Sequence, residues 1–433
     1  MSNKTSLVIV VLVWIFVATN YLVHTPFGPM NICMCHDCLS HLQYTETLLK
    51  QDRFPLLLGG IGNFDASHHP PLYYLINSFI APDQLMKGNR MVHVNLVRAM
   101  SVVYGAIVLL LISWFLNLIS KDPIRKLLVL LFIATTPKFV NVFTSYNNDT
   151  LTIVLSMLVL FIAYRLYMSW SNKLLILLFL VATCGLYTKV TIVIPILFVI
   201  LLCFRNLLLM KLPTKNQMMV VIVLMLSLSL LLLWYNFRTG VERRPIINYP
   251  RFTISSPQIN YVINSAFRVP LLQIPQEAWG DPWVHTTNDP WSNNGHPARK
   301  ADNYYAYMWI SSVIGSAIYT KPSISVVWFM LFVHLLVCLF TLREIFRREA
   351  LKAEIIRLSI FLIFFSHLIH LVVLSFLYSG ASLDYRYLCW TWLGWAILYV
   401  SALSKNPKLL SILMFVSILI NIYVNVTVDG YLS

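Results

Sequence analysis

The sequence is poor in charged residues, and this shortage excludes most classes of soluble protein. Of its 433 residues only 11% are charged, whereas 58% are hydrophobic, and the mean hydropathy is +0.72. A soluble core does not need so many apolar side chains. The sequence also lacks a Walker loop, the glycine fingerprint of a dinucleotide-binding fold and a His-Glu-x-x-His element. These absences disfavour a nucleotide-driven pump and a membrane metalloprotease of those types.

Long apolar runs are abundant instead. A run of about 18 or more apolar residues suffices for one helical span of a bilayer. Such runs lie at 6–24, 96–119, 150–168, 173–188, 190–209, 218–236, 322–341, 357–379, 387–403 and 409–427, with a weaker one at 125–142. The sequence therefore predicts an all-α polytopic membrane protein with about eleven transmembrane helices. We expect these helices to form one domain over 1–433, and the first to be retained, because no small-residue cleavage site follows it.

The distribution of basic residues predicts the orientation in the membrane. The net charge is +15, and many Lys and Arg residues fall in short turns, Arg205 and Arg343 among them. Cytoplasmic turns carry such an excess, so we expect the N-terminus inside and two long outer loops at 25–95 and 237–321. Long loops cross the membrane regardless of charge, and their own basic residues suggest an anionic ligand such as a lipid phosphate rather than nucleic acid.

The first outer loop concentrates most of the reactive polar side chains. It reads HDCLSHLQY at 36–44 and HHPPLYY at 68–74. Carboxylate, imidazole and phenol groups gathered in so apolar a chain predict chemistry at the outer membrane surface. The spacing of residues 41–49 predicts an amphipathic interfacial helix that ends before Pro55, and a second helix should open at Leu72 after two prolines.

Three of the seven cysteines also lie in this loop, at Cys33, Cys35 and Cys38. A disulfide is permitted outside the cytoplasm, although three cysteines cannot all pair. A zinc site that includes His36 is the less favoured alternative, because the Cys-x-Cys-x-x-Cys spacing is a weak zinc signature.

Taken in order, these motifs resemble the GT-C superfamily of membrane glycosyltransferases. The similar branch contains the dolichyl-phosphate-mannose–protein mannosyltransferases and the bacterial aminoarabinose transferases. The matching positions are Asp37, His41, Tyr44, His69-Pro70-Pro71-Leu72-Tyr73-Tyr74, Asn147-Asn148-Asp149, Thr188-Lys189 and Arg386-Tyr387. The resemblance covers the chain to about residue 205 and resumes near 380–400. One departure is that Cys38 follows Asp37, whereas many relatives have two adjacent acids there.

The resemblance implies an inverting transfer of one sugar. The donor would be a polyprenyl phosphate sugar, and the acceptor a hydroxyl of a glycan, lipid or protein at the outer face. No cofactor is implied with certainty, although a divalent cation is open. A base must remove the acceptor proton opposite the departing phosphate. Asp37 takes that role by resemblance, and a helix cap is its alternative.

The other candidate residues are substrate contacts with plainer alternatives. Asp149 would orient the acceptor or a metal, or else cap a helix. Lys189 and Arg386 would bind the phosphate, or else snorkel to the interface. The remaining candidates for substrate binding are His41, Tyr44, His68, His69, Tyr73 and Tyr387.

Two rival functions stay open. One is a non-catalytic translocase or scaffold for lipid-linked sugars, which should carry ionisable residues through its bundle interior. The other is an oligosaccharide ligase or polymerase. The short cytoplasmic turns favour a bacterial inner membrane over the endoplasmic reticulum.

Overall fold

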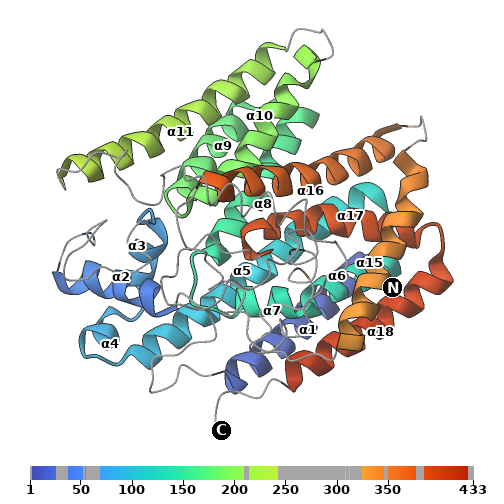
Figure 1. The fold of residues 1–433 in the computed structure, drawn as a ribbon, viewed down its shortest axis with the longest axis horizontal. Coiled ribbons are helices and arrows are strands. Elements are labelled where there is room, and N and C mark those ends of the chain that lie inside the picture. The colour runs from blue at the N-terminus through green and yellow to red at the C-terminus, as the bar shows by residue number, and fades with distance from the viewer. Residues whose placement is uncertain are drawn as a thin grey trace, which may run out of the picture. The chain divides into compact units, whose positions relative to one another are not determined.

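The computed structural model describes residues 2–25, 38–51, 54, 69–208, 214–241, 308, 312, 324–345, 350–376 and 385–427. Every regular element within these ranges is a helix (Figure 1), which confirms the expected all-α class. Two compact units divide the chain, and each is discontinuous in sequence. Unit 1 is Met1–Thr25, Ile112–Val142 and Ile247–Ser433, and unit 2 is Pro26–Leu111 and Phe143–Ile246.

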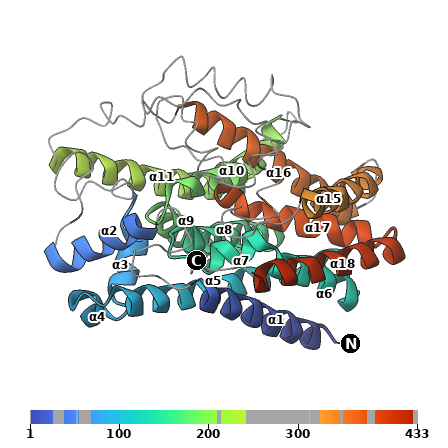
Figure 2. The ribbon, with the colours of Figure 1, turned by 60° about the horizontal axis from the view of Figure 1, so that its bottom comes forward.

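Unit 1 is a bundle of apolar helices. Its elements are α1 (Asn3–His24), α6 (Pro123–Thr135), most of α7 (Pro137–Phe143), α15 (Ile324–Ile345), α16 (Ala350–Phe376), the 3-10 helix η7 (Tyr385–Thr391), α17 (Trp392–Leu403) and α18 (Pro407–Val426). Helix α6 packs against α1, α17 and α18, and α16 packs against α17. Figure 2 shows α15, α17 and α18 side by side.

Helix α1 shows why these elements suit a bilayer. Its buried residues recur every three or four positions and form one stripe against the unit: Ser6, Val10, Trp14, Val17 and Tyr21. Its other faces carry exposed large apolar side chains such as Phe16, which is 60% exposed. Apolar side chains all around a helix are expected where the outer faces meet lipid.

The weaker predicted run at 125–142 is a bent pair of helices. Asp122 caps α6 by accepting hydrogen bonds from the backbone N–H groups of Ile124 (2.9 Å) and Arg125 (3.3 Å). Helices α6 and α7 meet at an angle of 61° at Thr136. Pro137 explains the break, because proline lacks the N–H that would continue the helix.

Unit 2 combines short surface helices with long apolar ones. Its elements are α2 (Cys38–Gln51), α3 (Leu72–Ser78), α4 (Pro82–Met86), α5 (Arg90–Ile119, up to Leu111), α8 (Asp149–Met168), α9 (Asn172–Leu186), η2 (Val190–Ile192), α10 (Val193–Leu208) and α11 (Lys215–Val241). Helix α2 packs against α3 and α4 (Figure 1), and α9 packs against α8 and α11. The predicted helices over 41–49 and from Leu72 are confirmed.

Six of the described helices are long and apolar enough to cross a membrane: α1, α5, α8, α11, α16 and α18. The bent pair of α6 and α7 passes the same test together, and α9, α10, α15 and α17 contribute shorter apolar segments. The class of polytopic membrane protein is therefore supported, and each predicted run overlaps one helix or two consecutive helices. The number of eleven spans stays a prediction.

Candidate active site

Six of the predicted site residues lie in unit 2. They are His41 and Tyr44 on α2, His69 just before α3, Tyr73 on α3, Asp149 at the start of α8, and Lys189 between α9 and η2. Asp37 and His68 lie outside the described residues. Arg386 and Tyr387 belong to η7 in unit 1, and their side chains also lie outside the description.

Asp149 and Lys189 form a buried ion pair. The Lys189 Nζ lies 2.6 Å from the Asp149 Oδ1, and the two side chains are 5% and 2% exposed. Lys189 follows the end of α9, where its own N–H donates to the Gly185 carbonyl at 2.9 Å. Because its side chain is only 5% exposed, its ammonium group faces the interior of the unit. The interpretation that Lys189 snorkels to the membrane interface is therefore wrong.

The carboxylate of Asp149 is also not the cap of α8. Asn148 occupies the N-cap position and makes no side-chain cap bond, and Asp149 is the first residue of the helix. The Asn147 Oδ1 accepts from the Asp149 N–H at 2.7 Å. A carboxylate at a helix N-terminus is favoured by the helix dipole, and here it also meets a cation. Asn147 thus holds the backbone of Asp149, and Lys189 holds its carboxylate.

The aromatic and imidazole groups of α2 and α3 form a second cluster beside residues 147–149. The His41 Nδ1 lies 2.7 Å from the Tyr74 hydroxyl, and the rings of Tyr44 and Tyr74 stack with centroids 3.7 Å apart. The Tyr44 hydroxyl donates to the His69 carbonyl at 3.3 Å, and the rings of His41 and His69 stack at 5.7 Å. Four groups from two sequence motifs therefore meet.

Tyr74 joins this cluster to the segment before Asp149. Asn148 donates its amide Nδ2 to the Tyr74 hydroxyl oxygen at 3.5 Å. The same hydroxyl lies 2.7 Å from the His41 Nδ1, and it donates to this nitrogen or accepts from it according to the tautomer of the ring. Tyr74 thus links the predicted first outer loop to the residue that precedes Asp149.

The backbone brings two further motifs together. The N–H of Leu72, at the start of α3, donates to the carbonyl of Tyr187 at 2.8 Å. Leu72 follows the two prolines, and Tyr187 immediately precedes Thr188-Lys189. The prolines lack N–H groups, so Leu72 supplies the first N–H after them. The motif at 68–74 therefore lies against the segment that carries Lys189.

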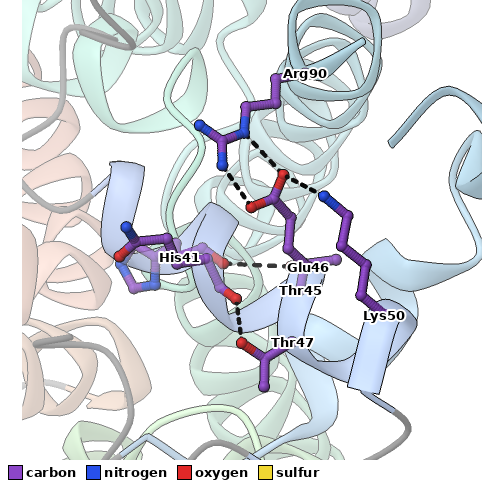
Figure 3. A network of polar contacts seen from close by, with 7 residues as sticks. His41, Thr45, Glu46, Thr47, Lys50 and Arg90 are labelled. Carbon is purple, nitrogen blue, oxygen red and sulfur yellow. Dashed lines mark hydrogen bonds and ion pairs between the residues drawn. The ribbon is translucent and has the colours of Figure 1, made fainter. Parts of the chain in front are cut away.

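An ion-pair network fastens α2 to the start of α5. The guanidinium of Arg90 donates to both carboxylate oxygens of Glu46, at 2.8 and 2.7 Å, and Lys50 lies 3.5 Å from the same carboxylate. Figure 3 shows Glu46 between Arg90 and Lys50. The two-bond fork fixes an angle as well as a distance. It therefore sets the position of the helix that carries His41.

Within the described ranges no group of three or more His, Cys, Asp or Glu side chains could hold an ion. Cys38 is disulfide-bonded, and its partner lies outside the described residues. A sulfur in a disulfide is no thiolate ligand, so the structure favours the disulfide over the zinc site.

No protein-family model matches this sequence, and no curated protein matches it. The likeness to GT-C glycosyltransferases therefore rests on the order of the motifs. The function that it implies is a proposal.

Sequence reasoning placed Tyr74 in a motif but did not select it as a site residue, and it missed Tyr146 and Arg98. The hydroxyls of Tyr74 and Tyr146 each lie within hydrogen-bond distance of a histidine ring. Arg98 is a charged residue that is only 1% exposed on a membrane-length helix. An ionisable residue inside an apolar run is a signal of function that the sequence did contain. The pairing of Glu46 with Arg90 had no local signal, because 44 residues separate the partners.

Proposed function

We propose that the protein is a membrane glycosyltransferase that moves one sugar from a polyprenyl phosphate to an acceptor hydroxyl at the extracytoplasmic face. The observation that carries the proposal is the buried pair of Asp149 and Lys189, 2.6 Å apart, next to the His41–Tyr74 hydrogen bond. Buried ionisable groups in a membrane protein are costly, so they mark a candidate functional site by default.

The proposed reaction is a single displacement. Asp37 takes the proton of the acceptor hydroxyl, and the hydroxyl oxygen forms a new bond to the anomeric carbon. The bond from that carbon to the phosphate oxygen breaks, and its electron pair leaves on the lipid phosphate. The configuration at the anomeric carbon is inverted. The new glycoside and the polyprenyl phosphate are the only products, so no nucleotide or redox partner is needed.

The geometry suggests a division of labour between the charged residues. The ammonium of Lys189 bonds to the Asp149 carboxylate, so we assign it to holding that carboxylate in place. Asp149 would then orient the acceptor. Arg386 remains the candidate for the phosphate, because a guanidinium forms two parallel bonds to it. His69, which is partly exposed beside Tyr44, is the candidate for a further phosphate contact.

The rival functions predict different chemistry. A translocase or scaffold would bind the lipid-linked sugar without breaking the bond to phosphate. An oligosaccharide ligase or polymerase would use a preassembled chain and leave a monosaccharide donor intact. The release of free polyprenyl phosphate from a monosaccharide donor therefore separates the proposal from both.

The test uses the full chain purified in lipid nanodiscs. Mannosyl and aminoarabinosyl polyprenyl phosphates serve as donors, and a panel of serine peptides, simple glycosides and glycolipids supplies hydroxyl acceptors. We expect Asp37→Asn to bind the donor but to lose about 10²–10⁴-fold in turnover, the usual scale for a general base. Asp83→Asn is the matched control, because Asp83 is exposed in the same outer loop. Near wild-type transfer by Asp37→Asn would refute the assignment of the base. Donor binding without any release of polyprenyl phosphate would favour the translocase.

A further inference from the structure

Arg98 is a buried cation that the proposed reaction does not use. It lies on α5, within a candidate membrane span, and its side chain is only 1% exposed. Its Nε donates to the carbonyl of Thr144 at 2.6 Å. A charge at such a position is expensive unless hydrogen bonds compensate for it. Packing alone therefore does not explain why a charged side chain occupies this position of α5.

The segment that Arg98 contacts is the turn before Asp149. One helical turn after Arg98, the Ser101 hydroxyl shares its single hydrogen between the Val97 carbonyl of its own helix, at 3.1 Å, and the next carbonyl of the turn, that of Ser145, at 3.2 Å. Residues three apart lie on the same face of a helix. Helix α5 therefore presents two donors in register with two consecutive carbonyls of this turn.

The rest of the turn, residues 146–149, is held by side chains of α2, α3 and α5 and by Lys189. The Tyr146 hydroxyl bonds to Thr45 on α2 at 2.8 Å and to the His93 Nε2 on α5 at 3.2 Å. After it, Asn148 reaches Tyr74 on α3, and Asp149 reaches Lys189.

The chemistry of His93 gives these bonds a direction. Its Nδ1 lies 2.8 Å from the Ile80 carbonyl, which can only accept. The hydrogen of the neutral ring therefore sits on Nδ1, and the Nε2 accepts from the Tyr146 hydroxyl. The oxygen of Tyr146 is then left to accept from Thr45. The turn is thus fixed by bonds of defined polarity and not only by contact.

We propose that Arg98 is a positioning residue that sets the place of the Asp149 carboxylate through the turn 144–149. This inference rests on the proposed function, because it assigns Asp149 a part in the reaction. Arg98 touches the backbone of the turn, and its effect reaches Asp149 through the chain. Misplacing a reacting group by about 1 Å can lower a rate by about a hundredfold. Loss of Arg98 should therefore slow turnover more than it weakens donor binding.

The test pairs a readout of the turn with a readout of the reaction. Arg98→Met removes every donor and keeps an unbranched side chain, and Arg98→Lys restores the charge and part of the hydrogen bonding. Arg165→Met is the control, because Arg165 is exposed near the other end of α8. Amide hydrogen exchange of the peptide 144–152 reports on the turn, whereas kcat and KM for the mannosyl or aminoarabinosyl polyprenyl phosphate report on the reaction.

We expect exchange at 144–152 to rise at least about tenfold in Arg98→Met and kcat to fall about 10–100-fold, with the KM changed by less than about threefold. Arg98→Lys should recover part of both effects, and Arg165→Met should change neither. If Arg98→Met does not fold, Ser101→Ala, which removes one hydroxyl, should show the same pattern at smaller amplitude. Exchange unchanged in these variants, or activity lost through KM alone, would overturn the inference.

The two proposals fail in different ways. If the wild-type protein transfers no sugar but the exchange at 144–152 rises as expected, Arg98 positions the turn and the glycosyltransferase reaction is wrong. If the wild type transfers sugar and the variants match it in exchange and kcat, the reaction stands and the role of Arg98 is refuted.

Discussion

The buried pair of Asp149 and Lys189 leads to a quantitative prediction. The two side chains are 2% and 5% exposed, so removing one partner strands the other charge in an apolar environment. Breaking such a pair costs about 3–5 kcal/mol of folding free energy. Lys189→Met, which keeps the length of the side chain, should therefore destabilise the protein by about that amount. Lys173→Met should cost no more than about 0.5 kcal/mol, because Lys173 is exposed at the start of α9.

A double-mutant cycle separates the pair from other effects of each substitution. The variant Asp149→Asn/Lys189→Met carries no stranded charge. It should be less destabilised than the sum of its two single variants by about 2–3 kcal/mol, at the upper end of measured couplings. The assay is reversible denaturant unfolding in mixed micelles, followed by tryptophan fluorescence. Additive effects of the two substitutions would show that the charges do not stabilise one another, and the proposed role of Lys189 would then be wrong.

Two further predictions concern how the helices of each unit are held. Glu46→Gln weakens the fork from Arg90, and we expect a loss of about 1–2 kcal/mol in the same unfolding assay. Glu354→Gln should cost no more than about 0.5 kcal/mol, because Glu354 is 26% exposed and its ion pair with Arg357 is 3.8 Å long; equal stability of the two variants would contradict this. In Gly394→Ala the new Cβ would lie 2.9 Å from the Ser359 carbonyl on α16, so the helices must separate. A loss of about 1–3 kcal/mol should appear as a lower unfolding temperature, and an unchanged temperature would refute the tight packing.

Local signals in the sequence predicted the elements around the candidate site. The prolines at 70 and 71 marked the start of α3, and the apolar run after Asp149 marked α8. Proline and the ends of apolar runs act through neighbouring residues, so they can be interpreted without knowledge of the fold. The order of the motifs likewise selected six residues that lie in one unit.

Partners that are distant in sequence could not be predicted in the same way. The lysine that pairs with Asp149 lies 40 residues away, and the tyrosine that binds His41 lies 33 residues away. Such contacts depend on how helices pack, which periodicity does not specify. The length of an apolar run likewise does not fix the length of the helix. The run at 173–188 predicted one membrane span, whereas α9 has only 15 residues.

The interleaving of the two units in the sequence has a consequence for biogenesis. Unit 2 is complete once residue 246 has been synthesised, whereas α1 packs against α18, which begins at Pro407. Chains fold from the N-terminus as they emerge, at about 5–20 residues per second. Helix α1 must therefore wait in the bilayer for α18, and at these rates the delay is about 20–80 s. Throughout that time the face of α1 that includes Trp14 must be shielded by lipid, by α6 or by the insertion machinery. Slower synthesis would lengthen the exposure of unit 1 more than that of unit 2, whose segments are closer together in the sequence.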